Sequence, residues 1–194
     1  MSKKTIHFGG LNWLVLNETD GKVFVLSEKS IGDMPFDTDN CNDWKQASLR
    51  KFLNGEFLEQ LKRNGADLGK IIPTHRDLTA DDGLTDYGSC EDTVTLLTVT
   101  EYRNYRYSIH NLDDWWWLAT AYSTASNDYS SLARIVHTDG TLYDRIAYGG
   151  LSGVRPALTL SSEIFDSFKR DISEYSTEEL LKEMLRREKC ADEI

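Results

Sequence analysis

Alternating apolar and polar residues predict two β-hairpins. Residues 11–17 and 22–27 are rich in residues that favour strands, and an Asp-Gly pair between them supplies the positive-φ turn that a hairpin needs. Residues 132–137 and 142–147 repeat this arrangement around a second Asp-Gly pair. Because successive side chains of a strand point to opposite faces, one set in each hairpin should face a core and the other set solvent or a ligand.

Three further stretches have the apolar spacing of helices. Asn42 or Asp43 can cap a helix that ends at an Asn-Gly pair, and a second helix over residues 56–63 ends at another such pair. A third, over residues 177–189, follows a capping box and carries one apolar stripe. Hairpins with two flanking helices and a C-terminal helix predict an α+β fold.

Length and charge restrict the possible partners. The chain has 194 residues and a net charge of -10, which argues against nucleic acid or an anionic membrane as the partner. No stretch approaches the roughly 18 apolar residues of a membrane helix, and no apolar segment of a secretory signal follows Lys3-Lys4. The cysteines Cys41, Cys90 and Cys190 are odd in number, as expected of free thiols in a reducing compartment. We therefore expect a cytoplasmic or virion-associated protein.

The segment 119–152 lacks five residue types. Lys, Glu, Gln, Met and Trp make up 34 of the 194 residues, yet none occurs in this segment. At the average composition it should contain about six of them. A codon with any first and second base and a pyrimidine third base encodes none of these five types. The segment therefore has the composition that such codons would produce.

The residues around this segment resemble a known family. Trp116-Trp117-Leu118 precedes it and Gly153-Val154-Arg155-Pro156-Ala157-Leu158 follows it, while Ser48-Leu49-Arg50 and Leu53-Asn54 lie earlier in the chain. This pattern resembles the C-type-lectin-like domain of phage and gut-bacterial proteins, in particular the variable proteins of diversity-generating retroelements. The chain departs from that family at Ala119, where Arg is common.

The resemblance implies an organisation and a function. A lectin-like domain would occupy residues 1–162, with a helical tail at 163–194. In that family, error-prone reverse transcription at template adenines rewrites a cassette whose side chains are displayed for ligand binding. Here the cassette would be the segment 119–152, and the implied function is non-catalytic binding of a protein or glycan.

Tyrosine, serine and asparagine in this segment are the candidate contact residues. Tyr supplies a stiff amphipathic contact area, whereas Ser, Asn and Asp adapt their hydrogen bonds, as in antibody paratopes. The predicted ligand-binding residues are Tyr122, Ser123, Ser126, Asn127, Asp128, Tyr129, Arg134, His137, Tyr143, Asp144, Arg145 and Tyr148. The residues expected to face the core are Leu132, Ile135 or Val136, Leu142 and Ile146. Trp116 and Trp117 are predicted scaffold residues, and Arg155 is expected to pair with a carboxylate.

Other chemistries have less support in the sequence. Residues 37–40 resemble the start of a calcium loop but lack its later Gly and Glu, and no His lies at zinc spacing from a Cys or another His, so we expect no metal and no cofactor. Formylglycine-generating oxidases have a similar fold but use a late cysteine pair, and residues 92–160 contain no cysteine. Cys90 has no activating His nearby in the sequence. The alternative to a binding protein is a fixed structural module of a phage tail or bacterial assembly, with its C-terminal helix as an assembly contact.

The codon composition makes a prediction about the gene. We expect the flanking DNA to contain a near-copy of the codons for residues 119–160, with adenine-rich AAC or AAT codons at the variable positions, beside a reverse transcriptase gene. Sequencing the locus checks this. A locus without such a copy would leave the missing residue types as a compositional bias only.

Overall fold

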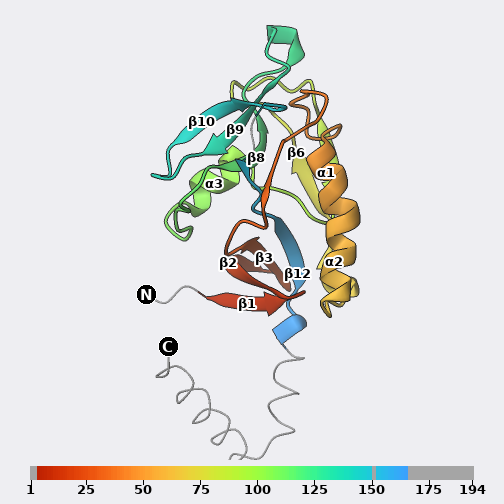
Figure 1. The fold of residues 1–194 in the computed structure, drawn as a ribbon. Helices are drawn as coiled ribbons and strands as arrows, with labels where there is room; N and C mark the ends of the chain where they lie inside the picture. The colour runs from red at the N-terminus through yellow and green to blue at the C-terminus, as the bar shows by residue number, and fades with distance from the viewer. Residues whose placement is uncertain (1–3, 150–151, 166–194) are drawn as a thin grey trace, which may run out of the picture.

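The computed structural model describes residues 4–149 and 152–165 (Figure 1). These residues are mostly β, with twelve strands in three sheets and one 16-residue helical segment. The predicted α+β, C-type-lectin-like fold with two flanking helices is therefore wrong. Strands such as β4, β5 and β11 are only two residues long and leave no periodic pattern in the sequence. The predicted helix at 177–189 lies outside the described residues.

The first sheet is antiparallel and has the order β1-β2-β3-β12-β5. Its strands are β1 (Thr5–Phe8), β2 (Leu11–Thr19), β3 (Lys22–Ser27), β12 (Ala157–Ser161) and β5 (Ile71–Ile72). The β2–β3 hairpin turns at Asp20 and Gly21, which both have positive φ, as the Asp-Gly pair predicted. Since β12 pairs with β3, the last described strand closes against the first hairpin.

The second sheet has the order β10-β9-β8-β11-β4. Its strands are β10 (Leu142–Ile146), β9 (Leu132–Val136), β8 (Trp116–Ala121), β11 (Ser152–Gly153) and β4 (Asp33–Met34). The pairs are antiparallel except for β11 with β8. The third sheet pairs β6 (Thr74–Asp77) with β7 (Ser89–Asp92). Figure 1 shows the loop after β8 at the end of the molecule opposite β1.

The two helices predicted on either side of Asn54-Gly55 form one helical segment instead. It consists of α1 (Ser48–Phe52), a π-helical turn η1 (Leu53–Phe57) and α2 (Leu58–Arg63), and it runs along one side of the molecule in Figure 1. Leu53, Phe57 and Leu61 are all buried, so the apolar face continues past the Asn-Gly pair. The remaining helices are η2 (Leu68–Lys70), α3 (Val99–Tyr105) and η3 (Ala125–Asn127).

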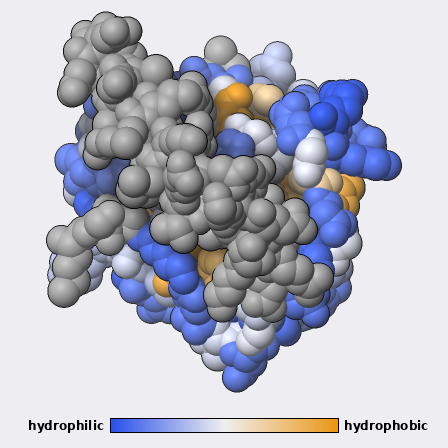
Figure 2. All heavy atoms as spheres, turned by 90° about the horizontal axis from the view of Figure 1, so that it is seen from below, coloured by the Kyte–Doolittle hydropathy of each residue, from blue (hydrophilic) through white to orange (hydrophobic). Residues whose placement is uncertain are grey.

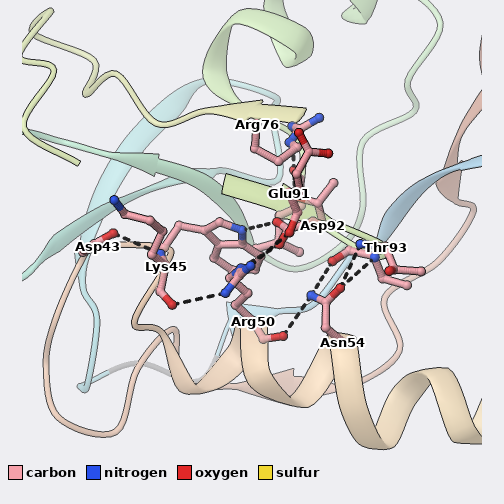
Figure 3. Close-up of polar contacts among 12 residues, drawn as sticks. Asp43, Lys45, Arg50, Asn54, Arg76, Glu91, Asp92 and Thr93 are labelled. Carbon is pink, nitrogen blue, oxygen red and sulfur yellow. Dashed lines mark hydrogen bonds and ion pairs between the residues drawn. The ribbon is translucent and has the colours of Figure 1, made fainter. Parts of the chain in front are cut away.

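A polar network ties this helix to β7 and the residues after it (Figure 3). The buried Asp92 carboxylate accepts hydrogen bonds from Trp44 Nε1 at 2.7 Å and Arg50 Nε at 2.6 Å. Asn54 Oδ1 accepts from the backbone N–H groups of Thr93 and Val94 at 3.0 and 3.1 Å, and its Nδ2 donates to Arg50 O and Val94 O. Asn54 therefore serves tertiary hydrogen bonding in mid-helix, which explains why it does not end the helix.

Two clusters of apolar side chains form the core on the two faces of β8. Trp117 lies in the larger cluster, where Phe36 packs against it at 5.6 Å, and Trp116 lies in the smaller one, where Tyr102 packs against it edge-on at 5.6 Å. Both tryptophans are at most 1% exposed. The surface visible in Figure 2 is, by contrast, mainly hydrophilic, with small apolar patches.

Residues 154–156 carry the chain from the second sheet to the first, and Arg155 at their centre is fully buried. Its guanidinium donates to the carbonyl oxygens of Ser27 at 2.8 Å, Glu28 at 3.0 Å and His110 at 3.1 Å, and it lies 5.2 Å from the Trp116 ring centroid. These partners are backbone carbonyls, not the carboxylate that the sequence led us to expect. Burial lowers the pKa of Arg155 to about 10, so it remains charged at neutral pH.

Replacing Arg155 tests the contribution of this crossover to stability. We expect Arg155→Met to lower the free energy of unfolding by at least about 3 kcal/mol, because it leaves buried carbonyls without donors. Urea denaturation measures the change. The matched control Arg63→Met removes an exposed arginine of α2 and should change stability by less than about 0.5 kcal/mol. Equal stabilities of the two variants would contradict the assigned role.

Candidate binding surface

Asn42 holds the loop between β8 and β9 from inside the protein. Its fully buried Nδ2 donates to the carbonyl oxygens of Ser123 at 3.0 Å, Tyr129 at 2.6 Å and Leu132 at 2.8 Å, and its Oδ1 accepts from the Tyr87 hydroxyl at 2.6 Å. Every residue of the loop has a backbone carbonyl oxygen, whatever its side chain. The loop can therefore change its side chains and keep these hydrogen bonds.

An acidic loop over residues 78–88 supports the same segment from a second side. Ser123 Oγ donates to Asp82 and Thr124 Oγ1 donates to Asp86, each at 2.5 Å. The bond from Ser123 lowers the pKa of Asp82, and bonds from Ser126 and then Thr124 lower the pKa of Asp86. Ser123 is fully buried, so this predicted contact residue faces inward.

A first group of predicted contact residues, the tyrosine cluster, consists of Tyr122, Tyr129, Arg134 and Asp144. The two tyrosine rings meet edge to face at 5.3 Å, and the Arg134 guanidinium lies 5.7 Å from the Tyr122 ring centroid. Arg134 also lies 3.1 Å from an Asp81 oxygen and 3.7 Å from an Asp144 oxygen. The positive charge of Arg134 is therefore balanced within the protein, while Tyr122 and Tyr129 stay 37% and 45% exposed.

A second group, the tryptophan cluster, consists of the predicted contact residues His137, Tyr143 and Arg145 together with Trp115, which was not among them. Trp115 and Tyr143 are nearly parallel with ring centroids 6.4 Å apart, and the Arg145 guanidinium lies 5.3 Å from the Trp115 ring centroid. His137 packs 4.9 Å from Trp115 and 5.5 Å from Tyr143. These side chains cover one another at the edge of the second sheet.

The two clusters lie on opposite faces of the second sheet. Asp144 pairs with Arg134, and the next residue, Arg145, pairs with Ala133. Because alternate residues of a strand point to opposite faces, the predicted contact residues of β9 and β10 do not form one continuous surface. The sequence could not show this because it left the register open by one residue.

The register also corrects one inward-facing prediction. Ile135 and Val136 are both buried, but Ile146 is 50% exposed, so its predicted core position is wrong. β10 is an edge strand whose described side chains are at most partly covered, which is why a large apolar residue remains exposed there. Leu132 and Leu142 are half-buried.

The other predicted contact residues are exposed around η3 and after β10. Asp128 adopts a left-handed conformation with φ of 60°, and Asn127 Nδ2 donates to Ser123 Oγ at 3.3 Å. The Tyr148 N–H donates to Asn40 Oδ1 at 3.2 Å while its side chain is 64% exposed. Ser126 completes this exposed set.

Sequence reasoning missed the residues that position the surface. The sequence suggested Asn42 only as a possible helix cap and singled out neither Asp82 nor Asp86. An Asn side chain can cap a helix or hold a distant loop with the same amide group. Only its contacts with residues about 80 positions later in the chain distinguish the two roles. The only usable signal was the density of aspartates between residues 77 and 92.

Among residues 4–149 and 152–165, no group of three or more His, Cys, Asp or Glu residues is arranged to hold a metal. Burial raises the thiol pKa of both Cys41 and Cys90, which reduces the thiolate fraction at neutral pH. Within the same residues, no helix has the length and apolar character needed to cross a membrane.

Comparisons with known proteins give one match. Residues 91–162, from the end of β7 to the residue after β12, match a family described as a domain of unknown function (DUF6273). No curated protein matches the chain. No solved structure matches it. The matched residues include β8, β9 and β10 and therefore both clusters.

Changing Asn42 tests its role as the anchor of the loop. In Asn42→Asp an oxygen replaces the donating Nδ2 and faces the carbonyls of Ser123 and Leu132, so we expect the loop to detach from its support. Hydrogen exchange should become at least about tenfold faster at the Tyr122 N–H, which donates to Leu132 O at 2.8 Å. The exposed control Asn104→Asp should leave that rate unchanged. Equal exchange in both variants would contradict the prediction.

Proposed function

We propose that this chain is a non-catalytic binding protein that contacts a protein or glycan through exposed side chains of the segment 119–152. One observation carries the proposal. Among the described residues, six large apolar or aromatic side chains are exposed, and five of them belong to this segment: Tyr122, Tyr129, Tyr143, Ile146 and Tyr148. Exposed aromatic residues concentrated in one segment are typical of a recognition surface.

The way the segment is held supports this proposal. Asn42 and Tyr87 lie outside the segment, and the Asn42 side chain holds three of its carbonyls. Asp81 N–H likewise donates to Ala121 O at 3.0 Å. A surface whose backbone is fixed in this way loses little conformational entropy on binding, which favours affinity.

We further propose that the exposed positions of the segment are diversified at the DNA level, as in retroelement variable proteins. The absence of Lys, Glu, Gln, Met and Trp from residues 119–152 supports this. Positions that need an apolar side chain, such as Ala133, Ile135 and Val136, are buried in the core and would have to stay fixed. Such a protein would act on a virion or in the cytoplasm.

Substituting the tyrosines tests the proposed function. We expect the variant with Tyr122, Tyr129, Tyr143 and Tyr148 all replaced by Ala to lose its partners on protein and glycan arrays, because aromatic anchors supply most of the energy of such contacts. Its melting temperature should stay within a few degrees of the parent, since these side chains are exposed.

The matched control is Tyr107→Ala, which removes a tyrosine that is 99% exposed and lies outside the segment. It should keep every array partner. A quadruple variant that folds and binds as the parent does would contradict the proposal and favour a fixed structural module.

A further inference from the structure

We propose that the tyrosine cluster binds a basic segment of a partner protein, one that presents Lys or Arg side chains. The proposal rests on the proposed function and names the chemistry of its partner. It is carried by the juxtaposition of exposed tyrosine rings with the exposed carboxylates of Asp82, Asp86 and Asp128.

The acidic side of this juxtaposition comes from the third sheet and its loop. Residues 77–92 contain six Asp or Glu residues and no Lys or Arg. This stretch lies directly against the loop of the tyrosine cluster, through the bond from Asp81 N–H to Ala121 O at 3.0 Å and the side-chain bonds of Asp82 and Asp86. Asp128, at the tip of the loop, adds a further exposed carboxylate.

The nearby arginines are already engaged by other carboxylates. Arg134 lies between Asp81 and Asp144, and Arg103 lies 3.3 Å from a second oxygen of Asp81. The charges of Asp82, Asp86 and Asp128 are therefore not balanced by these two arginines. Exposed carboxylates beside a contact surface attract a cationic partner and disfavour an anionic one.

The tyrosine rings suit the same partner. An aromatic face within about 6 Å of a Lys or Arg cation attracts it. Arg134 already occupies such a position over Tyr122 at 5.7 Å, while the Tyr129 ring is 45% exposed and meets Tyr122 edge to face. A cation from the partner can lie against the exposed Tyr129 ring, in the same loop whose Ser123 and Thr124 bind Asp82 and Asp86.

The charge of these carboxylates persists in mildly acidic solution. Hydrogen bonds from Ser123, and from Ser126 and Thr124, lower the pKa of Asp82 and Asp86 respectively below the ordinary value. Both carboxylates stay ionised well below pH 7, so binding of a basic segment should not weaken between pH 7 and about pH 5.

The test uses defined peptide probes and the full chain. Fluorescence anisotropy compares an alternating Gly-Lys peptide with a Gly-Glu peptide of equal length, at low and high salt. We expect the parent to bind the Lys peptide and not the Glu peptide, with weaker binding at high salt. The triple variant Asp82→Asn, Asp86→Asn and Asp128→Asn should bind the Lys peptide about tenfold more weakly.

The control separates the site from the overall charge of -10. It removes the same number of charges elsewhere on the exposed surface, through Asp20→Asn, Glu56→Gln and Glu59→Gln. It should retain the parent affinity within about twofold. If the triple variant fails to fold, Asp128→Asn alone serves, because its side chain is exposed, and about two- to fivefold weaker binding is expected.

The outcomes distinguish the inference from the function on which it rests. Equal weakening by the triple variant and its control, or equal binding of both peptides, overturns the inference. The proposed function survives that result if the tyrosine variant still loses its array partners. If the array partners are neutral glycans, the inference of a basic partner is likewise overturned, whereas the proposed binding function is retained. Retained Lys-peptide binding after Tyr122→Ala and Tyr129→Ala overturns the role of the rings.

Discussion

A buried positive charge connects the two large sheets of this protein. Arg155 lies where the chain passes from the second sheet to the first. Its guanidinium N–H groups donate hydrogen bonds to carbonyl oxygens at the end of β3 and in the stretch before β8. A guanidinium without partners in the interior would cost several kcal/mol, so the surrounding backbone must hold these positions. The start of β8 is thereby fixed relative to the first sheet, and Gly153 N–H donates to Trp115 O at 2.7 Å beside it.

The opposite end of β8 is fixed by a different buried polar group. Asn42 holds the carbonyls that follow this strand, so the strand is fixed at both ends by side chains from elsewhere in the chain. Both anchors act on backbone atoms, and buried hydrogen bonds to backbone do not depend on the identity of the residue that carries the carbonyl. The backbone of the segment can thus be held rigidly while its exposed side chains change. This is the physical requirement for a surface that varies between copies of a gene.

The sequence predicted what depends on neighbouring residues and missed what depends on distant ones. Both Asp-Gly hairpins form as expected, because Asp20-Gly21 makes a two-residue turn with positive φ and Gly140 supplies the positive φ in the longer connection of the second hairpin. Asn54 failed as a helix end because its amide serves Thr93 and Val94. The split of the contact residues between two faces follows from the pairing of Asp144 with Arg134, a one-residue choice of register that no local pattern specifies.

The two clusters differ in how much of their interaction capacity is already used. In the tryptophan cluster Trp115 contacts His137, Tyr143 and Arg145, while Tyr143 stays 53% exposed. In the tyrosine cluster Tyr129 has an aromatic contact with Tyr122 and stays 45% exposed, in the loop that Asp82 and Asp86 support. The smaller number of aromatic contacts at Tyr129 favours the tyrosine cluster as the site of the proposed partner, and the contacts of the tryptophan cluster cover the edge of the second sheet.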